Sequence, residues 1–134
     1  MNRTACVTLD MEPDHGDPHK QIRLLENPDY FERYVSTVNK YNAKVTMFTV
    51  TNLFETRGKL FEKLAARIPL EFSVHSHTHD PRNACTLDEV RNSQKAYEDF
   101  TGAKPIGYRA PIGRIDKAGL GHLLDHGFEY DASV

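Results

Sequence analysis

Short apolar runs alternate with longer amphipathic stretches along the whole chain, and this alternation constrains the fold more than any other feature. The runs are mostly apolar and rich in β-branched residues, as buried strands are, whereas the stretches repeat apolar residues at helical spacing. Strands that alternate with helices of this length predict parallel βαβ units with right-handed crossovers. The expected strands cover residues 4–9, 44–51, 70–74, 105–108 and 128–134, and the expected helices cover residues 28–41, 53–68, 86–100 and 116–126.

Local signals support the expected helix boundaries. Pro28 suits the first turn of a helix, and Asp116 is a suitable N-cap. Thr86 and Glu89 have the spacing of a capping box, in which each side chain bonds the backbone of the other residue. Gly102 and Gly127 follow two of the helices and are expected to end them.

Ligand sites of parallel α/β folds lie at the carboxyl ends of the strands, in open sheets and in barrels alike. A metal or catalytic site is therefore expected where several strand ends carry reactive side chains. Such side chains follow or end four of the five runs: Asp10 and Glu12 at the first, His75 and His79 after the third, Arg109 after the fourth and Asp131 in the fifth.

The segment His-Ser-His-Thr-His at residues 75–79 holds three histidines in five positions. Imidazole is the commonest protein ligand of zinc-like metals. His75 and His79 are four residues apart, so a helical turn or compact loop would place both rings on one side, where they can share an ion. His77 is expected to support the site or to face solvent. The alternative is that the histidines only decorate a polar loop.

Carboxylates that could complete such a site follow the first expected strand: Asp10, Glu12 and Asp14. Asp10 and Glu12 are two residues apart and would project to the same side of an extended segment, so one could bind metal while the other accepts a proton. Considered alone, they could also be solvated loop acids. Arg109 precedes a Pro/Gly turn; if buried it would pair with these acids, and otherwise it is a surface residue.

Bulk properties exclude several function classes. The 134 residues carry 17 basic and 19 acidic side chains, a net charge of −2, which is not typical of a nucleic-acid partner. No apolar stretch approaches the ~20 residues of a membrane span, and no leader is visible, so we expect no membrane partner and a cytoplasmic location. Cys6 and Cys85 are expected to be free thiols, with Cys6 buried. Motifs for nucleotide binding and serine acyl transfer are absent.

Several segments, in order along nearly the whole chain, resemble motifs of the polysaccharide deacetylases of the NodB-homology type, carbohydrate esterase family 4, with their allantoinase-like relatives. Thr-Leu-Asp-Met-Glu at 8–12 resembles the T-F-D-D motif, and residues 44–50 are similar to a K-A-T-F-F-V strand. Residues 75–79 match H-[S/T]-x-x-H, residues 109–113 resemble R-x-P-[Y/F]-G, and residues 130–133 are similar to Y-D-S-S.

The resemblance implies an α/β fold, namely part of a distorted (β/α)7 barrel with about five parallel strands and four helices. Residues 1–134 would form a single, C-terminally incomplete domain of this type. It further implies a divalent metal, zinc or a similar ion, on His75 and His79, with Asp10 as general base and Arg109 orienting that base. The expected reaction is hydrolysis of an N-acetyl or related amide or ester group on a carbohydrate substrate, an N-acetylated glycan.

Two departures from the family pattern matter. Met11 stands where the family has the aspartate that is usually the third metal ligand, and a thioether does not suit a hard or borderline ion. Glu12, or less favourably Asp14, is expected to replace it. The later family motifs, which carry the general-acid histidine and its carboxylate, have no counterpart in residues 1–134, so we expect metal binding with weak or no activity of this chain alone.

Two other functions remain open from the sequence. An H-x-H metallo-phosphoesterase or amidohydrolase site would use His75 and His77, although such pairs usually follow the first strand. A non-catalytic pseudo-enzyme could instead bind glycans or a protein partner. The open edges at the first and fifth strands would then favour homo-oligomers.

Overall fold

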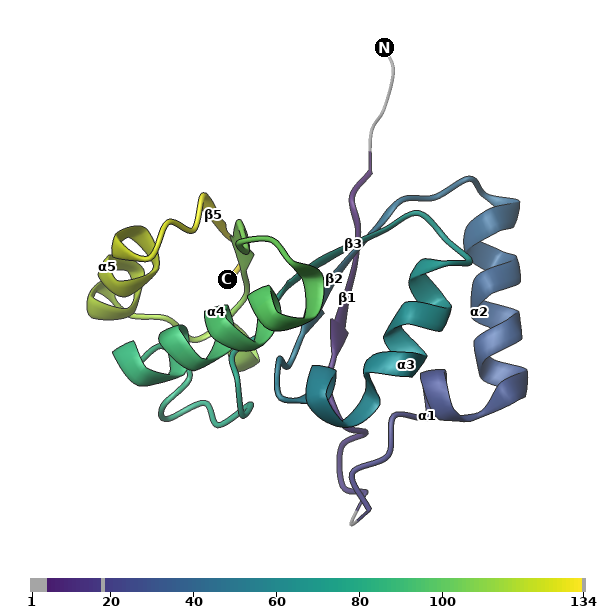
Figure 1. Cartoon of the computed structure of the whole chain (residues 1–134), viewed down its shortest axis with the longest axis horizontal. Helices are drawn as coiled ribbons and strands as arrows, with labels where there is room; N and C mark the ends of the chain where they lie inside the picture. The colour runs from purple at the N-terminus through teal and green to yellow at the C-terminus, as the bar shows by residue number, and fades with distance from the viewer. Residues whose placement is uncertain (1–4, 18, 134) are drawn as a thin grey trace.

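The computed structural model describes residues 5–17 and 19–133, which form one five-stranded parallel sheet with helices packed against it (Figure 1). The strand order β1-β2-β3-β4-β5 follows the chain, so the predicted α/β class with five parallel strands is confirmed. The strands are β1 (Val7–Met11), β2 (Val45–Thr49), β3 (Leu70–Val74), β4 (Gly107–Tyr108) and β5 (Tyr130–Asp131). The helices are α1 (Arg23–Glu26), α2 (Pro28–Lys40), α3 (Leu53–Ala65), α4 (Leu87–Thr101), the 3₁₀ turn η1 (Pro111–Gly113) and α5 (Lys117–Asp125).

The strands end in a single row across the sheet. Met11 is opposite Thr49, Thr49 is opposite Val74, Val74 is opposite Tyr108, and Tyr108 is opposite Asp131. Because all strands are parallel, the residues that follow this row leave the sheet at the same edge. The register thus brings the reactive segments after β1, β3 and β4 to one end of the molecule.

The core lies between the sheet and its helices. In Figure 1, α2 and α3 lie beside the N-terminal strands, and α4 and α5 lie toward β4 and β5. Between α3, α4 and β3 the rings of Phe54, Phe61, Phe72 and Phe100 pack together, with Phe54 stacked on Phe100 at 4.3 Å between ring centres. This cluster fixes the two crossover helices against β3, the strand that leads into the histidine segment.

The predicted helix starts are largely confirmed. Pro28 is the first residue of α2, and the Asp116 carboxylate caps α5 by accepting from the Gly119 amide at 2.8 Å. Thr86 caps α4, but only half of the capping box forms. The Glu89 amide donates to Thr86 Oγ1 at 3.5 Å, while the Glu89 carboxylate turns to the histidine segment.

One expectation about the N-terminal region is wrong, and one short helix there was not predicted. Cys6 is exposed rather than buried, because β1 begins only at Val7 and, within the described residues, pairs with β2 alone, so its first residues face solvent. The short helix α1 was not expected, because its four residues carry too little pattern to predict a helix. Among the described residues, no helix is long and apolar enough to cross a membrane.

Candidate metal centre

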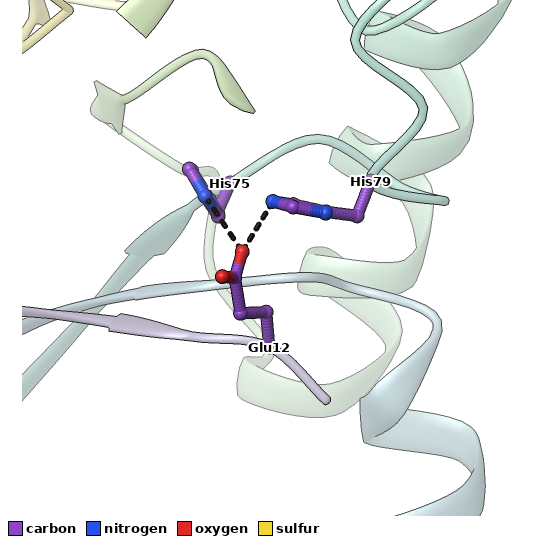
Figure 2. A group of neighbouring side chains, drawn as sticks. All are labelled: Glu12, His75 and His79. Atoms are coloured by element: carbon purple, nitrogen blue, oxygen red, sulfur yellow. Dashed lines mark ion pairs between the residues drawn. The ribbon is translucent and has the colours of Figure 1, made fainter. Parts of the chain in front are cut away.

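Glu12, His75 and His79 form the one group of potential metal ligands that the structure brings together within the described part of the chain. One ligand atom from each residue lies within 4.8 Å of the others. The two imidazoles approach the same carboxylate oxygen of Glu12 from different directions (Figure 2). His75 Nε2 is 3.4 Å from this oxygen, and His79 Nε2 forms the shorter ion pair with it.

His75 is held by the sheet and by its own ring. It directly follows β3, and its backbone amide donates to the carbonyl of Thr49 in β2 at 2.9 Å. The side chain is 2% exposed, and Nδ1 lies 2.7 Å from the carbonyl oxygen of Arg109. A carbonyl only accepts, so Nδ1 donates to it, and Nε2 faces Glu12. This orientation by an outer partner is typical of histidines that bind metals.

His79 is held by a tight loop instead. The backbone of Ser76 and His79 is left-handed, with φ of 62° at each residue, a conformation that non-glycine residues adopt only when their surroundings impose it. The His79 amide donates to Ser76 Oγ at 3.0 Å, and the Ser76 carbonyl accepts from the Thr51 amide at 3.0 Å. The loop thereby turns the His79 ring back toward the end of β1.

The carboxylate beside the histidines comes from Glu12 and not from its neighbours. Met11 is buried in the core at 2% exposure, so the next residue along the extended chain faces the opposite way, toward the site. Hydrogen bonds with His75 and His79 lower the pKa of the Glu12 carboxyl from 4.5 to about 2. Asp14, the other candidate, is bound to Arg23 through both the backbone amide and the guanidinium of that residue.

Arg109 connects this group to Asp10. Its Nη1 donates to Asp10 Oδ1 at 2.6 Å, and its guanidinium lies over the ring of Phe48 with 4.1 Å to the ring centre. Nε donates to the carbonyl of Ala132 at 3.2 Å, so β1 and the segment after β5 are joined through one side chain. The predicted pairing of a partly buried arginine with an acid of the first strand is thus present in the structure.

His77 lies outside the group of three, as the sequence predicts. Its Nδ1 is 3.1 Å from Thr51 Oγ1, and its backbone amide donates to the Glu89 carboxylate at 3.0 Å. Sequence reasoning missed Thr51 and Glu89 as supports of the loop. The spacing of Glu89 after Thr86 was visible, but it pointed to helix capping rather than to a contact with the histidines.

The donor set fits a catalytic zinc or similar divalent ion. Two imidazole nitrogens and one carboxylate oxygen are a common ligand set for catalytic zinc, which keeps a further position open for water. Glu12 is about one third exposed, so solvent reaches the group. A cleft of about 490 Å³ begins at His79 and Thr78 and continues between the 13–17 loop and the start of α3. Of the three side chains, His79 is the one that lines this cleft.

Comparisons with known proteins identify the family that this chain resembles. The family model described as "Polysaccharide deacetylase" matches residues 2–130. A peptidoglycan deacetylase of Helicobacter pylori is 29% identical over 106 residues, covering 76% of this chain and 36% of that protein. A family 4 carbohydrate esterase of Streptomyces lividans, solved in complex with acetate, superposes with a TM-score of 0.69 at 16% identity, covering 94% of this chain and 59% of that one.

A pseudoenzyme of the same esterase family from Bacillus anthracis also superposes with a TM-score of 0.69 at 16% identity. The match covers 94% of this chain and 42% of the pseudoenzyme. The chain thus spans roughly a third of the curated relative and about half of these solved structures. The family model covers nearly all residues, and the sheet matches the fold of its members. The chain belongs to the polysaccharide deacetylase family.

Proposed function

We propose that this chain carries the metal site and catalytic base of a hydrolase that removes N-acetyl groups, or related amide- or ester-linked groups, from a carbohydrate. The observation that carries the proposal is the double role of Arg109. Its carbonyl oxygen accepts from His75, and its guanidinium donates to Asp10. One residue thus sets the spacing between a metal ligand and a general base, the two functions that amide hydrolysis requires.

In this proposal Glu12, His75 and His79 would hold the ion, and the bound ion would supply polarisation of the substrate carbonyl and a lower pKa of a water molecule. Asp10 accepts the proton of the attacking water, and its carboxylate is 39% exposed and accessible for that task. The guanidinium of Arg109 holds this carboxylate in place through a charge-assisted hydrogen bond. It stays a prediction that residues 1–134 belong to one domain. It also stays a prediction that the general acid is carried by the later motifs of the family.

The substrate class follows from the family rather than from side chains. The Helicobacter pylori relative is described as a peptidoglycan deacetylase, and we propose an N-acetylated glycan such as peptidoglycan as the substrate of this chain as well. Zinc is the proposed ion because the ligands are two imidazoles and a carboxylate.

Zinc titration by calorimetry tests the proposal. Replacing His75 or His79 by alanine should weaken zinc binding by at least about 100-fold, because a ligand counts for more than the outer partners, whose loss costs 10–100-fold. The comparison variant is His77→Ala, from the same loop, which should lose much less affinity than either ligand variant because its ring contacts Thr51 and not Glu12. Equal binding by all three variants would refute the site. Zinc loss in His77→Ala, with binding kept in His79→Ala, would favour the H-x-H alternative.

Acetate release from an N-acetylated oligosaccharide tests the base. Asp10→Asn should keep zinc binding and lose about 10²- to 10⁴-fold in rate, the usual contribution of a general base. A second candidate function is a metal-binding pseudo-enzyme. It is favoured by Met11, which occupies a position where the resembled motif has an acid. It would be supported by a wild-type chain that binds zinc and whose rate of acetate release is not lowered by Asp10→Asn.

A further inference from the structure

We propose that Glu89 is a positioning residue for His79: its carboxylate holds the 76–79 loop in the conformation that directs the imidazole to Glu12. The inference rests on the proposed metal site. Glu89 lies in the first turn of α4, away from the three candidate ligands, and is half-buried. It acts through the backbone of the loop rather than through any contact with an ion.

The carboxylate accepts three hydrogen bonds from the loop. Oε2 accepts from the backbone amides of His77 and Thr78 at 3.0 and 3.1 Å, and Oε1 accepts from the Thr78 hydroxyl at 2.8 Å. Hydrogen bonds to an ionised acceptor are about twice as strong as neutral ones. Two successive amides that point at one oxygen define the path of the chain immediately before His79.

The Glu89 carboxylate is available for this role because the helix start does not need it. In a capping box it would return to the backbone amide of Thr86, but that amide donates to the carbonyl of Asn83 at 2.9 Å. The position at the start of α4 also favours a negative charge, since the first amides of a helix carry partial positive charge.

His79 depends on its backbone more than His75 does. The His75 ring is fixed by the Arg109 carbonyl, whereas Nδ1 of His79 has no hydrogen-bond partner among residues 5–17 and 19–133. The direction of the His79 ring therefore follows from the left-handed backbone at this residue. On its other side the loop is tied to the start of α3 by the amide of Asn52, which donates to the His77 carbonyl at 3.3 Å. Glu89 supplies the opposing restraint.

Zinc titration of the whole 134-residue chain tests the role of Glu89. Glu89→Ala should weaken binding by about 10–100-fold, the usual cost of losing an outer partner. Glu89→Gln should lose less, because one amide oxygen can still accept. The matched control is Asp88→Ala, which removes the same charge from the same helical turn. Asp88 is exposed and makes no side-chain hydrogen bond with any described residue, so this variant should bind within about twofold of wild type.

Two further readouts separate positioning from a general loss of structure. Circular dichroism should show that both Glu89 variants without metal unfold cooperatively. The visible absorption of bound Co²⁺ should change in Glu89→Ala and not in Asp88→Ala, because the band reports the arrangement of the ligands. If Glu89→Ala does not fold, Glu89→Gln decides the question.

Zinc binding by either folded Glu89 variant as tight as that of Asp88→Ala would overturn the inference and leave the metal site standing. A wild-type chain that binds no zinc would overturn the proposed function itself. The two failures are therefore distinguishable in one set of titrations.

Discussion

His75 and His79 face the same carboxylate oxygen, yet the molecule holds them by different means. His75 continues a central strand, is bonded through its amide to the neighbouring strand, and has its ring fixed by a carbonyl. His79 lies in a loop with left-handed backbone and is fixed through side chains that bind the loop's amides. The strand supplies one position as part of the fold, whereas the other position depends on a few specific hydrogen bonds.

The difference teaches where the site is sensitive to change. A residue placed by a parallel sheet can be displaced only by disturbing the core, whereas a loop residue can be displaced by a single distant substitution. Changes at the His75 side should therefore appear in the stability of the protein, and changes at the His79 side should appear in metal binding alone.

The largest difference in stability is expected between the two histidine variants of the metal-free protein. His75→Ala should lower the free energy of unfolding by about 1–3 kcal/mol, because it removes a buried side chain and leaves the Arg109 carbonyl without its donor. His79→Ala should change it by less than about 0.5 kcal/mol, as is usual for partly exposed positions. Urea denaturation of the two variants measures the difference. Equal destabilisation would break the distinction between a strand-held and a loop-held ligand.

A smaller effect is expected from a contact between α4 and β3 that precedes the site. The Tyr97 hydroxyl donates to the carbonyl of Phe72 at 2.9 Å, so Tyr97→Phe should cost about 1 kcal/mol of stability. Zinc affinity should not change, because His75 is held by the rest of the sheet. Thermal unfolding and calorimetry on the same preparation measure both quantities. A loss of zinc affinity here would show that the strand side is as sensitive as the loop side.

The smallest effect concerns acid. The lowered pKa of Glu12 means that its ion pairs stabilise the metal-free protein above the unfolded value of 4.5, and that this contribution is lost as the pH falls from about 4.5 toward about 2. The contribution should be below about 1 kcal/mol, because the side chain is partly exposed and solvent screens the pair. Glu12→Gln should flatten the pH dependence of the unfolding free energy in this window. An unchanged slope would argue against the ion pairs.

Much of the fold could be predicted because its signals are local and repeat. The strands β2 and β3 and the helix starts at Pro28 and Asp116 lie where period and capping residues place them. The helix α1 could not be predicted, because a four-residue helix depends on its contacts more than on a sequence pattern. The exposure of Cys6 could not be predicted either, because it depends on where the edge strand begins.

The candidate site divides in the same way. Residue spacing and strand ends indicated His75 and His79 as ligands but left the acid open among Asp10, Glu12 and Asp14. The family resemblance, together with the alternation of an extended chain, favoured Glu12. Asp14 is further engaged by Arg23, a contact that no spacing rule indicates. The role of Glu89 could not be predicted, because its spacing from Thr86 is typical of helix caps. Only the direction of its side chain shows that it bonds the histidine loop and not the helix start.

The alignment of strand ends across the sheet has a consequence for how this family can vary. Since side chains alternate along β1, deleting one residue between Val7 and Met11 would reverse every following position. Asp10 and Glu12 would exchange faces with Met11, so a carboxylate would enter the core while a thioether met the histidines. Insertions in the crossover helices do not change which side chains of β1 face the core. The crossover helices can therefore change length more easily than the first strand can.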